Sequence, residues 1–308
     1  MRGSSKINSK IGKFSKVVLG VLVAAVAIVP SFACGVAAKA APVKETSKIV
    51  GMKLNKCFPD STFARYVYEE VLGHDEWKCK GADYHITDAD ADVIGSYEII
   101  NFSGRGCTSL DGIEYFTQLE ELDCSNNLLK TLVVSGCRHL STLRCSSNMI
   151  SYLNFSGCPL INLVCSKNPI YGDLNMACCA DTESIGGYIN CSDTNIKNIR
   201  IPSGKSSISY INASRCYNLE GLSAIYTDGL VDVNLSNCSS LKSVCLMGCK
   251  DLRSVNVSHC RDLYVLDLLQ SDDISTVGID GCENLKWLKI SPKVDTHSIF
   301  GLELYEAK

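Results

Sequence analysis

The residues with the most reactive side chains do not form a recognisable catalytic motif. Ser258, His259 and Cys260 are adjacent, but the repeat pattern described below buries Cys260 and places His259 in a loop. Glu120 and Glu121 fall on an expected strand, where consecutive side chains point to opposite faces, so they are not expected to act together as acid and base. No glycine-rich phosphate loop is present. We therefore predict that the protein is not an enzyme.

Metal chemistry would need clustered ligands at characteristic spacings, which this sequence lacks. It has 18 cysteines but no Cys-x-x-Cys pair, and its five histidines are scattered. An EF-hand-like loop can be aligned from Cys79 to Asp90, but only Asp83 fits among the early ligands, and Tyr84 stands where glycine is needed. The acidic run over 88–92 is interpreted as a solvated turn. We expect no metal and no cofactor.

The cysteines are better explained as core residues, because a thiol is a small apolar group that packs well in a repeated column. Equivalent residues of stacked coils point in parallel, which disfavours disulfides between them. We therefore expect most of these cysteines to be reduced. For Cys57 and Cys79, before the repeats, a disulfide and two thiols are equally compatible with the sequence.

Polar residues that recur every 22 positions favour binding chemistry. Asn190, Asn212, Asn234 and Asn256 form such a series, and tyrosines or an aspartate lie two residues before three of them. The amides could bond from coil to coil or form a polar binding stripe, and exposed tyrosines are good interface anchors. The candidate ligand-binding residues are Glu121, Asp123, Arg144, Tyr188, Asn190, Tyr210, Asn212, Asp232, Asn234 and Asn256.

An internal repeat determines which elements position these residues. Units such as Leu119-x-x-Leu122-x-Cys124-x-x-Asn127 end at positions 127, 148, 168, 194, 216, 238, 260 and 282. A second pattern, as in Leu129-x-x-Leu132-x-Val134, is nested halfway through each period. One coil cannot bury its leucines alone, so the repeat predicts a solenoid of stacked coils with short parallel strands. A serine column one residue after the strands is expected to cap the turns.

This pattern resembles bacterial leucine-rich repeats of the nested IRREKO type, with a cysteine variant at Cys124, Cys145, Cys165 and Cys191, over roughly residues 117–290. The chain departs from that family where cysteine replaces asparagine from position 216 onward. The resemblance implies a β-rich solenoid with an irregular convex side, a small helical N-terminal cap, and ligand binding by the concave sheet.

The segment before the repeats resembles the N-terminal caps of secreted bacterial repeat proteins through its Phe58-Pro59-Asp60 start and its Gly112–Phe116 motif. Residues 58–71 predict an amphipathic helix with Asp60 or Ser61 as N-cap. The expected organisation is a signal peptide at 1–40, a linker at 41–55, the cap at 56–118, about eight coils of 20–26 residues at 119–290, and a C-terminal cap or tail at 291–308. Residues 171–187, in the enlarged third repeat, are expected to form a projecting loop.

The N-terminus indicates export. A basic stretch precedes an apolar run of 13 residues, Val17–Val29, and Ala38-Lys39-Ala40 fits a cleavage site. Retention of this segment as a membrane anchor and lipidation of Cys34 are the two alternatives. Cleavage at this site would leave no membrane span. Residues 41–308 hold 24 basic and 33 acidic residues, a net charge of −9, which argues against nucleic-acid binding.

The sequence thus predicts a secreted or cell-surface protein that binds another protein or a glycan on a host or bacterial surface, with adhesion or host interaction as its role. The alternative is a structural component of the cell envelope, anchored at its N-terminus by a lipid or by the membrane.

Overall fold

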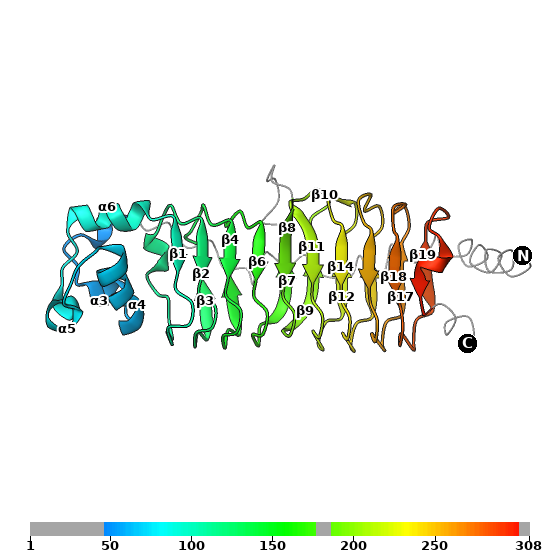
Figure 1. Ribbon diagram of the computed structural model, residues 1–308, viewed down its shortest axis with the longest axis horizontal. Coiled ribbons are helices and arrows are strands. Elements are labelled where there is room, and N and C mark those ends of the chain that lie inside the picture. The colour runs from blue at the N-terminus through cyan, green and yellow to red at the C-terminus, as the bar shows by residue number, and fades with distance from the viewer. Residues whose placement is uncertain (1–45, 177–185, 302–308) are drawn as a thin grey trace, which may run out of the picture.

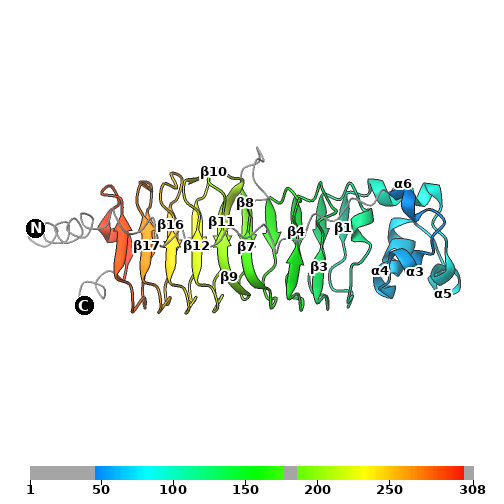
Figure 2. The same cartoon turned by 180° about the vertical axis from the view of Figure 1, so that it is seen from behind.

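The computed structural model describes residues 46–176 and 186–301, with the backbone alone at 79, 80 and 82. The expected signal peptide, most of the third-repeat loop and the end of the C-terminal tail lie outside these ranges. The Cys79 side chain also lies outside the description. The choice between a Cys57–Cys79 disulfide and two thiols therefore falls outside it as well. Figure 1 shows a row of coils along the long axis with the helices gathered at its left end, before the first coil, and Figure 2 shows the same row from behind.

Within the described ranges, ten short strands form one parallel sheet, which we call the first sheet. In spatial order they are β1 (Ile99–Asn101), β2 (Glu121–Asp123), β4 (Thr142–Arg144), β6 (Asn162–Val164), β8 (Gly187–Asn190), β11 (Ile208–Asn212), β14 (Asp232–Asn234), β16 (Ser254–Asn256), β18 (Thr276–Gly278) and β20 (Ile299–Phe300). Since β1 pairs with β2, the ladder of coils already begins at Ile99.

The return half of each coil, where irregular connections were expected, carries further parallel strands. Six of them form the second sheet: β7 (Tyr171–Asn175), β9 (Asn195–Arg200), β12 (Gly221–Ser223), β15 (Ser243–Cys245), β17 (Val265–Leu268) and β19 (Trp287–Ile290). Two smaller pairs are β3 (Thr131–Val133) with β5 (Tyr152–Asn154), and β10 (Gly204–Lys205) with β13 (Thr227–Asp228). The nested half-repeat explains these strands, because it supplies a second set of inward apolar residues to each coil.

The core is a set of apolar columns along the solenoid axis. From β2 to β18, the inward apolar residue of each first-sheet strand is at most 2% exposed, and it pairs in register with its equivalent in the next coil. This column consists of Leu122, Leu143, Leu163, Ile189, Ile211, Val233, Val255 and Val277. The structure is therefore the predicted leucine-rich repeat solenoid.

The buried asparagines tie neighbouring coils together. The Asn148 amide donates from Nδ2 to the carbonyl of Cys124 in the preceding coil at 2.9 Å, and its Oδ1 accepts from the Leu129 backbone N–H at 3.0 Å. Asn127 and Asn168 make equivalent bonds. Each side chain satisfies backbone groups that would otherwise be buried without partners.

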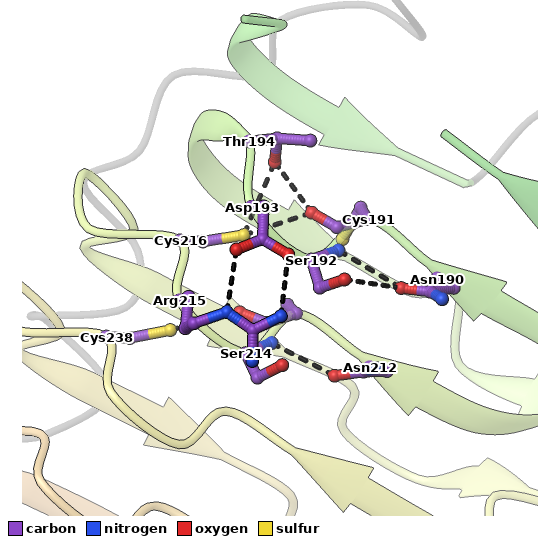
Figure 3. A network of polar contacts seen from close by, with 11 residues as sticks. Asn190, Cys191, Ser192, Asp193, Thr194, Asn212, Ser214, Arg215, Cys216 and Cys238 are labelled. Atoms are coloured by element: carbon purple, nitrogen blue, oxygen red, sulfur yellow. Dashed lines mark hydrogen bonds and ion pairs between the residues drawn. The ribbon is translucent and has the colours of Figure 1, made fainter. Parts of the chain in front are cut away.

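Cysteine takes over this position from Cys216 onward and keeps one of the hydrogen bonds. The Sγ atoms of Cys216, Cys238 and Cys260 each donate to the strand-end carbonyl of the preceding coil at 3.1 Å. The sequence predicted only a small apolar filler here, but the thiol also replaces the asparagine donor. Figure 3 shows the changeover, where Thr194 and Cys216 lie against Cys191.

The N-terminal helices close the first coil. They are η1 (Thr46–Ile49), α3 (Leu54–Cys57), α4 (Ser61–Tyr66), the π-helical η2 (Val67–Val71), α5 (Trp77–Lys80), η3 (Gly81–Asp83) and α6 (Asp88–Ser96). The short η4 (Ile113–Tyr115) follows in the first coil, and η6 (Thr296–Ser298) lies in the last. Ile49 and Leu54 are fully buried, so this half of the expected 41–55 linker is packed into the helical region. No described helix is long and apolar enough to cross a membrane.

Asp60 joins the helices to the solenoid. It is the N-cap of α4, as predicted, and Oδ1 accepts from the Thr62 and Phe63 backbone N–H groups. Its Oδ2 accepts two bonds from Thr108 in the first coil, at 2.9 and 2.7 Å. Burial opposes ionisation, but the hydrogen bonds from Thr108 and Phe63 outweigh it and lower the pKa of Asp60.

The acidic run was wrongly interpreted as a solvated turn. It forms the first turn of α6, and Asp90 is buried in a capping box with Thr87. Asp90 also accepts a hydrogen bond from the Tyr84 hydroxyl at 2.6 Å. Carboxylates are favoured at helix N-termini, which explains why aspartates cluster here.

We predict that Asn148→Ala lowers the free energy of unfolding by about 3 kcal/mol, because the Cys124 carbonyl and the Leu129 N–H lose their buried partner. Asn148→Cys should cost about half as much, since a thiol restores the bond to the carbonyl, as it does in later coils. Urea unfolding of the three proteins measures this order. Equal stability of the two variants would contradict the proposed donor role of the thiol.

We predict that the column thiols resist alkylation in the folded protein. Burial raises the pKa of the Cys165 thiol to about 12 and also raises that of Cys245, but Cys245 is only half-buried and lies on the surface of the second sheet, where the reagent can reach it. Iodoacetamide at pH 8 should modify Cys245 well before Cys165, and both should react equally in urea. Peptide mapping by mass spectrometry gives the two rates. Comparable rates in the folded protein would rule out a packed thiol column.

Candidate functional site

The outward residues of the first sheet form two parallel rows over strands β8, β11, β14 and β16. We call Asn190, Asn212, Asn234 and Asn256 the asparagine row, and Tyr188, Tyr210, Asp232 and Ser254 the tyrosine row. Neighbours within each row are direct partners across adjacent strands. The rows arise because the apolar middle residue of each strand points into the core, which turns the residues on both sides of it outward.

The two rows border one open groove with a volume of about 510 Å³. Its lining comprises all eight row residues together with Ile189, Ile211 and Val233, whose side chains are buried in the core. Tyr210 is the more exposed of the two tyrosines, with 48% of its surface accessible to solvent. At a strand separation of about 4.8 Å, the asparagine row spans about 14 Å.

Each amide in the asparagine row is held in one orientation by the turn that follows its strand. The Oδ1 atoms of Asn190, Asn212, Asn234 and Asn256 accept from the backbone N–H of the serine two residues later, at 3.0–3.2 Å. A backbone N–H can only donate, so the oxygen must face the turn and the NH₂ group must face away from it. The Nδ2 groups donate no hydrogen bond to any described residue.

The serine column supports these amides mainly through its backbone. Ser192, Ser214, Ser236 and Ser258 supply the N–H groups just described, and the Ser192 hydroxyl adds a bond to Asn190 at 2.9 Å. The turn beside β8 and β11 is held further by an ion pair in which Arg215 donates twice to Asp193, both at 2.7 Å (Figure 3). This pairing lowers the pKa of Asp193 and raises that of Arg215.

The structure separates the remaining candidate residues from the groove. Glu121 and Arg144 lie on β2 and β4 and form an ion pair, with Nη1 and Oε2 at 3.6 Å. Asp123 accepts from the Ser125 backbone N–H at 2.9 Å. Of the ten predicted site residues, only the seven on β8 to β16 share the groove.

Sequence reasoning missed Ser254, which lines the groove beside Asn256. Its position, 22 residues after Asp232, was the available signal. Gly278 ends the asparagine row, because a Cβ there would lie 2.9 Å from Ser258 Oγ and 3.1 Å from Asn256 Oδ1. The projecting-loop prediction is wrong for Tyr171–Asn175, which form β7, and its remaining part at 177–185 lies outside the described residues.

The reactive residues considered at the outset stay apart. Cys260 is fully buried, whereas His259 is an exposed turn residue with a φ of 63°.

The Asp232 carboxylate has no hydrogen-bond or ion-pair partner among the described residues, which leaves it open to a ligand in the groove. Over 46–176 and 186–301, no group of three or more His, Cys, Asp or Glu side chains could hold a metal ion.

No family profile and no curated protein matches the chain. Solved structures that align with it include the functional domain of InlJ from Listeria monocytogenes, which includes a cysteine ladder. The alignment has 17% identity, covers 79% of this chain and 71% of the InlJ chain, and has a TM-score of 0.34. The L. monocytogenes internalin InlF aligns at 13% identity over 79% and 98%, with a TM-score of 0.35. The LRIM1/APL1C complex aligns at 18% identity over 62% and 39%, with a TM-score of 0.34. The solenoid assignment rests on the chain's own repeats and strand pairing.

We predict that Asn212→Asp leaves the free energy of unfolding within about 0.5 kcal/mol of the unmodified protein, because one carboxylate oxygen can still accept from Ser214. Asp123 shows that aspartate fits this register position. Asn212→Ala should cost about 1 kcal/mol, because the turn loses its acceptor. Urea unfolding distinguishes the two. Equal losses would contradict the capping role of Oδ1.

Proposed function

We propose that this protein is an exported, non-enzymatic binding protein that recognises a macromolecular ligand through the groove over β8, β11, β14 and β16. One observation carries the proposal: two tyrosines, four outward amide donors and a carboxylate without a partner among the described residues line a single groove. Such a mixture of aromatic and polar groups is typical of recognition surfaces.

The rigidity of the scaffold supports a recognition role. Every groove strand is paired on both sides, and the asparagine side chains are fixed before any ligand arrives. Preorganised groups lose little conformational entropy on binding, which improves affinity and specificity. The open shape favours a ligand that extends beyond the groove over a small molecule, which a pocket would enclose.

Export is supported by the basic, apolar and small-residue segments of positions 1–40. An exported binding protein would meet its ligand on a host or bacterial surface, which is consistent with adhesion. A structural envelope component with a retained N-terminal anchor is the competing role, and it needs no groove.

Capture from surface extracts tests the proposal. The baits are the unmodified protein and the triple variant Tyr188→Ala, Tyr210→Ala and Asp232→Ala, both under reducing conditions. A matched control carries Tyr217→Ala, Tyr264→Ala and Asp262→Ala, which remove the same residue types from exposed positions outside the groove.

We expect the unmodified protein and the matched control to capture the same ligand, and the groove variant to lose at least nine-tenths of it. The ligand would be identified by mass spectrometry after cross-linking. Equal capture by all three baits, or none by any, would rule out the groove as the recognition site. Retention of the protein in the envelope fraction without a soluble ligand would support the structural role.

A further inference from the structure

We infer that the groove binds a neutral, linear oligosaccharide that lies along the solenoid axis, with roughly one sugar residue over each strand. The inference rests on the proposed function and specifies its ligand class. It follows from four properties of the groove, namely its donors, its acceptors and rings, its charge, and its period.

The asparagine row needs acceptors from its ligand. Four NH₂ groups face out of the turns, and none donates to a described residue. They cannot turn over to offer oxygen instead, since each Oδ1 is occupied by a backbone N–H. A ligand with closely spaced neutral oxygens, such as the hydroxyl and ring oxygens of sugars, satisfies this row.

The tyrosine row supplies the complementary contacts. The Asp232 carboxylate has no partner among the described residues, so it can accept from hydroxyl donors of the ligand. Tyr210 is its neighbour in the row and Tyr188 follows on the next strand, so both aromatic rings lie on one side of it, where the C–H face of a pyranose can pack on them. Sugars have hydroxyl groups that both donate and accept hydrogen bonds, and they have an apolar ring face. A sugar can therefore contact the amide donors, the Asp232 carboxylate and the tyrosine rings at once.

The charge of the groove disfavours anionic polymers. None of the described residues that line it is lysine or arginine, and the one formal charge is that of Asp232. Polyanions such as nucleic acids are bound mainly by cationic side chains, so this groove would repel them.

The spacing of the donors disfavours a peptide. The amides repeat at the strand separation of about 4.8 Å, which is close to the length of one pyranose ring in an extended chain. The carbonyls on one side of an extended peptide repeat at about 6.6 Å, and a helix uses its carbonyls internally. Neither matches consecutive donors, whereas a trisaccharide or tetrasaccharide spans the roughly 14 Å of the row.

The test repeats the capture with extracts in which one ligand class is destroyed. Mild periodate cleaves the vicinal diols of glycans, and protease digestion removes proteins. The baits are the unmodified protein, the double variant Asn212→Asp with Asn234→Asp, and the matched control outside the groove. The double variant removes two outward donors and keeps both turn caps, following the precedent of Asp123.

We expect capture to survive protease and to be lost after periodate, and the double variant to bind at least tenfold more weakly than the control. Neutral cellotetraose, whose sugar residues carry vicinal diols, should displace the ligand as a competitor better than anionic tetragalacturonate does. Stability of the double variant in urea separates lost binding from lost folding.

Capture that survives periodate and is lost after protease would overturn the inference and identify a protein ligand, with the proposed function intact. Stronger competition by tetragalacturonate would overturn the neutral-ligand assignment. If no bait captures anything from the untreated extracts, the proposed function itself fails.

Discussion

The structure depends on one hydrogen bond repeated from coil to coil, from a buried side chain in the turn to the strand-end carbonyl of the preceding coil. Asn148 makes it with an amide, and Cys216, Cys238 and Cys260 make it with a thiol. Because these donors reach the equivalent carbonyl of the preceding coil, the coils that they join are held at one offset. Thr194 is an exception, since its hydroxyl donates to the Cys191 carbonyl of its own coil. The apolar columns of the core follow from that fixed offset, since equivalent side chains can stack only when successive strands stay in register.

The same constraint creates the groove. Once the inward residues are in register, the outward residues are aligned as well, and a polar residue repeated every 22 positions becomes a row on the surface. The turns then set the orientation within the row, because Ser214 and its equivalents occupy the amide oxygens. Packing therefore determines where the side chains lie, and turn hydrogen bonding determines which of their atoms remain available.

Much of the architecture could be predicted because the leucine and asparagine spacing reflects stacking directly. The first-sheet strands and the core columns needed no further information. The strands of the return half were not predicted, and the sequence narrowed the N-cap of the cap helix only to Asp60 or Ser61. Three features could not be predicted: the thiol as a donor, the burial of Asp90 and the outward direction of the amides. Each depends on a hydrogen bond between residues that the repeat alone does not pair. The sequence also could not place Glu121 and Arg144 outside the groove, because a column of polar residues does not reveal where the surface is hollowed.

The uniform period of the later coils makes the length of the groove an adjustable property. From position 194 to 282, every coil has the same number of residues and the same type of turn. In-frame duplication of one such coil would insert a further strand without disturbing its neighbours, since each coil contacts only the one before and the one after. Unequal crossing-over within the gene could thus lengthen or shorten the asparagine row by one strand at a time. Selection could then match the length of the row to the size of the proposed ligand.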